Sequence, residues 1–241
     1  MIEVDSLLYK IDQKLNKLST SDHQGIQLED KILALNEAQL KLIKQKVDGI
    51  SIVSGQGLDA FKKRYEDLQS LIEDYHSLPL VDKNNKLNQW GCDISTLNPA
   101  YMFYIDSYIL ADKGRCKDRI IWINQDLAKH GDVSMLLKND HYKPSFEYQE
   151  TFNVISSDEI SIFTDGTFTP TKLFLSWMRY PLYIDKAGYV KFDGTNSSDV
   201  NCELEYYLED ELLDLTVQAL AMYTENSSAV QSAQFRIQTN E

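Results

Sequence analysis

The period of the hydrophobic residues changes near residue 80, and this change limits the folds open to the chain more than any other feature. Before it, apolar residues recur at three- and four-residue steps, as in amphipathic helices. After it, short β-rich runs between turn residues predict strands. We therefore expect an α+β fold with N-terminal helices (1–80), a central antiparallel β region with hairpins (81–204), and a C-terminal helix and tail (205–241).

Three helices are expected in the first region, over about 3–18, 27–47 and 58–77. Pro79 marks the end of the third. The helices are polar on their outer faces, so they pack either within one chain or against a neighbouring subunit. The apolar stripe of the third helix consists of Leu58, Phe61, Tyr65, Leu68, Ile72 and Tyr75.

Turn residues divide the β region. Gly114 lies in a turn between two predicted strands, and Asp165-Gly166 predicts a hairpin because alternating runs flank it. Lys186-Ala187-Gly188 predicts a further hairpin turn, and a short helix is expected within 125–138. The strands are expected at about 101–110, 115–124, 146–155, 159–164, 168–179, 183–185 and 189–192.

Negative charge dominates the chain and is concentrated in its later part. The formal net charge is −13. Residues 1–90 contain 12 basic and 14 acidic side chains, a net of −2, which leaves −11 for the remainder. Such a chain has too few cations to replace the counterions of DNA phosphates, so it is not expected to bind DNA by itself. Solubility alone also explains the charge.

The cysteines and the hydropathy pattern indicate where the chain works. Cys92, Cys116 and Cys202 are widely spaced and odd in number, which does not fit a disulfide framework and favours a reducing cytosol. The first residues lack the pattern of a signal peptide. No run of about 20 apolar residues is present, so no membrane-spanning segment is expected.

No catalytic, cofactor-binding or metal-ligating motif is apparent in the sequence. His130, Asp132 and His141 come nearest to a metal cluster, but their spacing fits no common site. Gly55-Gln56-Gly57 lacks the strand and the Lys-Ser/Thr pair of a P-loop. Polar side chains at the surface are enough to explain the histidines and the aspartate. We therefore expect no catalytic, cofactor or metal site, although an enzyme with an unfamiliar site stays open.

The last helix is expected from about Glu205 to Thr224. The acids that crowd its start stabilise a helix N-terminus, which is enough to explain them. The polar tail after it is expected to fold firmly only against a partner. Candidate assembly residues are Leu208, Leu212, Leu215 and Met222, as core anchors of the helix, and Asn226, Val230, Phe235 and Ile237, in the tail.

Two stretches of the last quarter, YPLYIDKAGYVKFDG (180–194) and CELEYYLEDELLDLTVQALAMYTEN (202–226), carry a resemblance to a known family. With a weaker echo in LLKNDHYKPSFEYQET (136–151), they resemble the head-to-tail ring proteins of crAss-like and related short-tailed bacteriophages. Glu205 departs from the family pattern, which has proline after the Cys-Glu-Leu triplet, and this alters the helix start. The helical first third carries no matching motif.

The resemblance implies a virion structural protein and not an enzyme. Proteins of this family form homo-oligomeric rings, usually dodecamers, on the portal and offer a platform to the next tail or ring protein. Genomic DNA would pass nearby without specific binding. The implied location is the neck of the virion, after assembly in the host bacterial cytoplasm, with no membrane partner. The alternatives are another tail component (muzzle, tube or fibre-attachment protein) and an acidic intracellular enzyme or regulatory protein.

Overall fold

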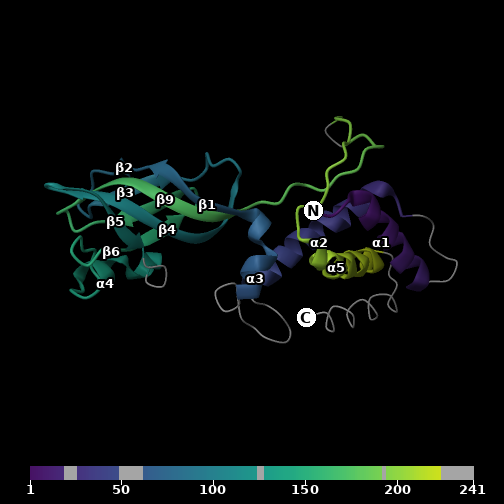
Figure 1. Cartoon of the computed structure of the whole chain (residues 1–241), viewed down its shortest axis with the longest axis horizontal. Coiled ribbons are helices and arrows are strands. Elements are labelled where there is room, and N and C mark those ends of the chain that lie inside the picture. Colours follow the sequence, from purple (N-terminus) through teal and green to yellow (C-terminus); the bar gives the residue numbers. More distant parts are fainter. Residues whose placement is uncertain (19–25, 49–61, 124–127, 192–193, 224–241) are drawn as a thin grey trace. The chain divides into compact units, whose positions relative to one another are not determined.

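The structure is a computed structural model and describes residues 1–18, 26–48, 62–123, 128–191 and 194–223 (Figure 1). It confirms the expected α+β fold. The chain divides into two compact units. The helical unit joins Met1–Leu71 to Pro181–Glu241, and the sandwich is Ile72–Tyr180. The sandwich is therefore inserted into the helical unit in sequence, and residues 181–204, expected in the β region, belong to the helical unit.

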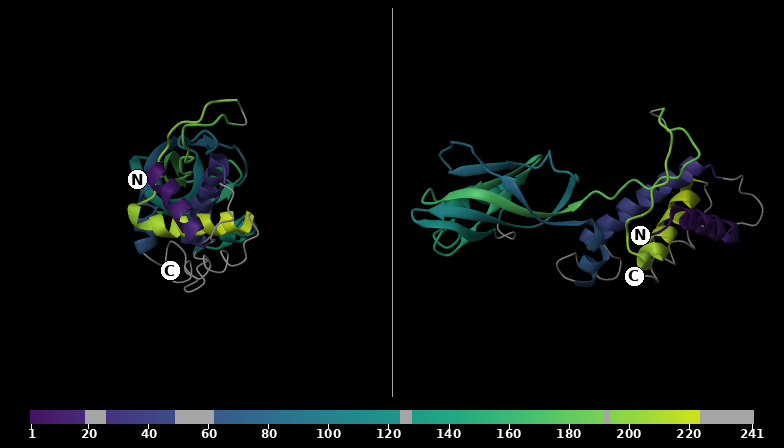
Figure 2. Two further views of the ribbon diagram at one scale, coloured as in Figure 1. Left: turned by 90° about the vertical axis from the view of Figure 1, so that its right-hand side faces the viewer. Right: turned by 45° about the horizontal axis from the view of Figure 1, so that its top comes forward.

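The helical unit is built on α1 (Val4–Leu18), α2 (Leu28–Asp48) and α5 (Glu209–Tyr223). α5 packs against both α1 and α2 (Figure 2). The periodic apolar positions of these helices are buried, as their spacing predicts. The buried side chains include Leu7, Ile11, Ile32, Leu35, Ile43, Leu212, Leu213 and Leu220. The shorter helical pieces are α3 (Lys62–Asp67), η2 (Gln69–Leu71) and η5 (Tyr206–Leu208).

The sandwich consists of two sheets with a shared core. One sheet has the strand order β1-β9-β4-β5-β6, and the other has the order β2-β3-β8-β7. All pairings are antiparallel except the parallel pair β5 and β6. The strands are β1 (Ile72–Pro79), β2 (Val81–Asp82), β3 (Gln89–Asp93), β4 (Tyr101–Lys113), β5 (Cys116–Ile123), β6 (Glu150–Thr151), β7 (Asn153–Ser156), β8 (Glu159–Phe163) and β9 (Thr169–Arg179).

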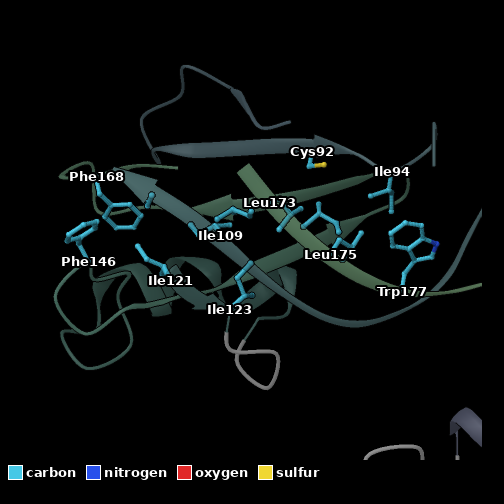
Figure 3. Packing of buried hydrophobic residues seen from close by; sticks show 13 residues of the cluster. Cys92, Ile94, Ile109, Ile121, Ile123, Phe146, Phe168, Leu173, Leu175 and Trp177 are labelled. Atoms are coloured by element: carbon cyan, nitrogen blue, oxygen red, sulfur yellow. The ribbon is translucent and has the colours of Figure 1, made fainter. Parts of the chain in front are cut away.

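Inward-facing residues of both sheets fill the space between them (Figure 3). Ile109 on β4, Ile160 on β8 and Leu175 on β9 are all fully buried in this cluster. A smaller cluster joins Leu136 of α4 (Val133–Lys138) to side chains of the four-stranded sheet. η4 (His130–Asp132) precedes α4, so the short helix expected within 125–138 is present, and residues 124–127 lie outside the described part.

Two turn predictions have different outcomes. Gly114 adopts a φ of +58° between β4 and β5, which pair as an antiparallel hairpin, so this prediction is confirmed. Asp165-Gly166 does form a turn, with φ +78° at Gly166, but the expected hairpin is wrong. β8 and β9 belong to different sheets, so the turn carries the chain from one sheet to the other. An Asp-Gly pair determines local backbone geometry and not which strands pair.

The expected third helix is wrong in its second half. α3 ends at Asp67, and β1 begins at Ile72 and pairs along β9. Tyr75, expected on a helical stripe, has a φ of +44° in a bulge of β1. Pairing with the long strand β9 therefore outweighs the local helical pattern, as tertiary context commonly does. Leu58 and Phe61 of the predicted stripe lie outside the described residues.

The hairpin expected around Lys186-Ala187-Gly188 is also wrong. Asp185 bridges to Val200 and Val190 bridges to Asn196, as isolated pairs. The chain therefore folds back near residues 191–195, where the Lys191 amide donates to the Thr195 carbonyl at 2.8 Å. The segment is a long loop whose two sides are joined by these isolated bridges, and the described residues of 183–191 form no strand.

The buried position of Leu175 gives a direct test of the sandwich core. Leu175→Ala should lower the free energy of unfolding of the sandwich by about 3 kcal/mol, because it leaves a cavity between the sheets. Trp90, Trp122 and Trp177 all lie in the sandwich, so tryptophan fluorescence during urea unfolding reports on this unit. Thr171→Ala, at an exposed position on the same strand, is the control and should change little. An unchanged midpoint for Leu175→Ala would contradict this core.

Candidate functional site

The acids at the start of α5 are paired with lysines of α1. The Glu209 carboxylate is 2.6 Å from the Lys10 ammonium, and Asp214 lies 2.6 Å from Lys14. Both acids are almost fully buried, at 5% and 2% exposed. The hydrogen bond from Lys10 to Glu209 raises the pKa of that lysine. Helix-dipole stabilisation is therefore only part of their role, because they also join the two ends of the chain.

A third ion pair ties α5 to α2. The Lys46 ammonium is 2.8 Å from Glu211 and 3.6 Å from Asp67, the last residue of α3 in the same unit. Asp67 is only 2% exposed. Breaking a buried pair by removing one partner is costly, since a desolvated charge is left behind. These pairs therefore fix the positions of α1, α2 and α5 relative to one another.

The loop before α5 is anchored to the same helices. The buried side-chain amide of Asn36 accepts from the Ile184 amide and donates to the Ile184 carbonyl, both at 2.8 Å, as a neighbouring strand would. At the other end of the loop, Ile2 and Cys202 exchange two backbone hydrogen bonds. Residues 181–204 are thus fixed on the N-terminal helices at both ends.

Asp185 organises the interior of this loop. Its carboxylate is 1% exposed and accepts from the Lys191 ammonium at 2.7 Å and the Tyr189 hydroxyl at 2.8 Å. Backbone amides of Lys186 and Ser198 also donate to it. Burial alone would raise the pKa of Asp185, but these donors outweigh it and hold the pKa below its usual value. The arrangement is structural, because every described partner belongs to the loop.

The predicted assembly residues differ in whether the structure buries them. Leu208, Leu212 and Leu215 are buried, as expected of core anchors. Met222 is 52% exposed, so its expected role as a core anchor is wrong. It lies in the last turn of α5, where Leu220 and Ala221 are still buried, so Met222 is on the face of the helix that points away from the core. Asn226, Val230, Phe235 and Ile237 lie outside the described residues.

A cluster of aromatic side chains, which the sequence analysis did not single out, lies on the outward side of the five-stranded sheet. We call Tyr75, Tyr108, Trp122 and Phe174 the aromatic face. Their strands β1, β9, β4 and β5 are consecutive in the sheet, and Tyr108 is directly opposite both Trp122 and Phe174. Trp122 is 52% and Tyr75 43% exposed. Alternation on β4 and β5 could have indicated it, since Ile109 and Ile121 point inward.

The rings of the aromatic face pack against one another. Tyr108 and Phe174 are stacked at 4.8 Å with their planes 4° apart. Tyr75 and Trp122 lie on either side of Tyr108, with ring centroids 5.3 and 5.6 Å away. The Tyr75 hydroxyl donates to Asp106 at 2.9 Å, and desolvation together with this bond raises the pKa of Tyr75 to about 12. The cluster is a preformed apolar surface with polar groups at its margin.

The described part of the chain has neither a metal-binding cluster nor a membrane-spanning helix. No group of three or more histidine, cysteine, aspartate or glutamate side chains there is arranged to hold a metal ion. His130, from the sequence cluster considered above, faces the Ile155 carbonyl at 3.1 Å instead. None of the described helices combines the length and the apolar composition needed to cross a bilayer.

No protein-family model matches the chain, and no curated protein matches it.

The pair between Lys14 and Asp214 can be tested by substitution. Lys14→Met should lower the free energy of unfolding of the helical unit by about 3 kcal/mol, because it removes the cation from a buried carboxylate. Far-UV circular dichroism during urea unfolding follows this unit, which contains most of the helix. Lys44→Met, at an exposed position on α2, is the matched control. Asp214→Leu added to Lys14→Met should recover most of the loss, and failure of both effects would show that the pair is unimportant.

The lowered pKa of Asp185 predicts a pH dependence. A carboxyl group whose folded pKa lies below its unfolded value stabilises the fold above the unfolded pKa of about 4, and the effect is lost as pH falls through the folded pKa. Asp185→Asn should therefore weaken the helical unit at pH 7 and cost progressively less towards pH 3. Unfolding midpoints of both proteins across this range would show it. A deficit that stays constant with pH would contradict the assignment.

Proposed function

We propose that this chain is a structural protein of a tailed-phage virion, a ring component of the head-to-tail connector attached to the portal. In this proposal identical subunits, twelve in number, form the ring and offer a platform to the next tail protein. Genomic DNA passes through the ring without specific binding. The protein is not an enzyme in this role, and it assembles in the cytoplasm of the host bacterium.

The observation that carries the proposal is the fixed position of the stretch that bears the resemblance. Residues 180–194 and 202–223 coincide with the anchored loop and with α5, which the ion pairs hold on α1 and α2. The similarity therefore falls on the part of the helical unit that fixes its C-terminal end. Tyr223, the last described residue, is 57% exposed, so the tail begins at the surface of a rigid element.

Charge supports the same role. The chain carries a net charge of −13, and the sandwich contributes −4 of it, from 15 acidic and 11 basic side chains in 72–180. Residues outside the sandwich therefore carry −9. An acidic surface repels the DNA backbone, because binding requires cations that replace phosphate counterions. A ring that DNA must pass through during packaging and ejection benefits from such repulsion.

A ring of identical subunits also needs two different surfaces on each copy. Heterologous contacts join one patch to another that lies elsewhere on the next subunit. This chain has two candidates of different kinds, the tail after Tyr223 and the aromatic face of the sandwich. The two-unit organisation keeps them on separately folded parts of the chain.

Removal of the tail tests the proposal. A chain that ends at Tyr223 should keep the tryptophan fluorescence and the urea unfolding midpoint of the full chain, because every described element is retained. Its capture by the portal protein of the same phage genome should weaken about tenfold or more, as expected when an interface segment is lost. Surface plasmon resonance on immobilised portal measures this.

The matched control removes only Thr239–Glu241, three polar residues, and should bind as the full chain does. A chain ending at Tyr223 that still forms complete rings on the portal would contradict the role of the tail. A full chain that the portal does not capture at all would contradict the proposed function itself.

A further inference from the structure

The aromatic face offers ring edges and one large indole, and this limits what it can bind. Because Tyr108 and Phe174 lie parallel at 4.8 Å, each covers a face of the other. Sugars and nucleic acid bases are bound by stacking on free ring faces, which this pair offers poorly. Trp122 and the neighbouring Ile120 are 52% and 42% exposed. An apolar protein segment fits such a surface, since exposed aromatic clusters of this kind are typical centres of protein interfaces.

Acids lie at the margin of the aromatic face beside Tyr75 and Trp122, whereas the exposed Lys172 lies two residues from Phe174 on β9. Asp106 accepts from the Tyr75 hydroxyl, and the exposed Glu150 is paired in register with Trp122 across β5 and β6. Carboxylates and aromatic rings both attract a cation, and the indole is the ring that attracts one most strongly. The best partner is therefore an apolar segment that carries a positive charge and no acid.

One segment of this chain has that composition. Residues 229–237 read AVQSAQFRI, with Val230, Phe235 and Ile237 as large apolar side chains and Arg236 as the sole charge. Arg236 is also the single basic residue of 224–241, whose two acids are Glu225 and Glu241. The segment has a net charge of +1, which complements the acids beside Tyr75 and Trp122 at the margin of the aromatic face.

The tail is long enough to serve a neighbouring molecule. Eighteen residues follow Tyr223, and an extended chain spans at most about 3.5 Å per residue, so the reach is about 60 Å. An aromatic face on one copy and a segment on the next are the two halves of a heterologous contact, which repeats around a ring.

We propose that the aromatic face binds residues 229–237 of a second copy of this chain. Phe235 and Ile237 contact Trp122 and Ile120, and Arg236 lies near the acids at the margin. The inference rests on the proposed function insofar as it names the surface that receives the tail during ring assembly. The contact itself needs neither the portal nor DNA, so it can be measured on the purified chain.

A labelled synthetic peptide of residues 224–241 provides the first test. The receptor is the full-length chain with Phe235→Ser, whose own tail is weakened as a competitor, and fluorescence anisotropy measures binding. We expect saturable binding that Trp122→Ala or Ile120→Ser in the receptor weakens about tenfold or more. Both side chains are about half exposed, so the receptor should keep its fold.

Matched controls separate the aromatic face from general hydrophobicity. Val81→Ser changes a side chain that is 62% exposed in the other sheet, and Tyr142→Ala changes one that is 49% exposed after α4. Neither should alter the affinity. In the peptide, Phe235→Ser should abolish binding, and Gln238→Ser should not. Absence of binding, or binding that survives Trp122→Ala unchanged, would overturn the proposal.

Mixing two full-length variants tests whether the contact joins different copies. Trp122→Ala lacks the aromatic face but keeps the tail, and Phe235→Ser keeps the face but lacks the tail. Neither variant should associate alone, and an equimolar mixture should form a 1:1 complex in sedimentation velocity. A mixture that stays monomeric overturns docking between copies. A Phe235→Ser chain that dimerises alone through Trp122 would show that two faces meet instead, which also overturns the proposal.

The peptide-binding test of this inference and the portal-capture test of the proposed function can fail independently of each other. Peptide binding that depends on Trp122, in a chain that the portal does not capture, would retain this inference and remove the connector role. Capture by the portal without any peptide binding would retain the connector role and remove this inference.

Discussion

The helical unit depends on the burial of two carboxylates, Glu209 and Asp214, against lysines of the first helix. Lys10 and Glu209 are 199 residues apart in sequence, yet their charged atoms are 2.6 Å apart. Each buried acid would be costly without its cation, so α5 is stable only where α1 supplies one. The apolar residues of α5 bury hydrophobic surface when the helix packs, and the ion pairs determine how α5 is oriented on α1. The two ends of the chain consequently fold as one unit, and the sandwich is an insertion between them.

This division assigns different tasks to the two units. The sandwich has a core of its own, and its five-stranded sheet presents the aromatic face outward. The helical unit ends in an exposed turn, at Met222 and Tyr223, from which the tail continues. A protein that must join identical copies in a closed ring needs such separate surfaces on stable supports. In the connector role that we propose, the net charge of −13 adds repulsion of the DNA backbone.

Local pattern predicted the elements whose stability is local. Helical spacing gave α1, α2 and α5, and Gly114 predicted the turn between β4 and β5. Long-range pairing explains the failures: β9 draws Ile72 and Tyr75 into a strand, and the turn at Gly166 joins two sheets. The lysine partners of α5 could not be found, because nothing near Asp214 in sequence indicates Lys14. The aromatic face needed the sheet order, since Tyr108 and Trp122 become neighbours only there.

In the role that we propose, the chain assembles with itself on a portal. The most direct measurement is the solution mass of the purified full chain, alone and mixed with the portal protein of the same genome, by light scattering after size exclusion. The account predicts stoichiometric capture by the portal, or a large closed oligomer. A monodisperse monomer or dimer that the portal leaves unchanged would contradict it.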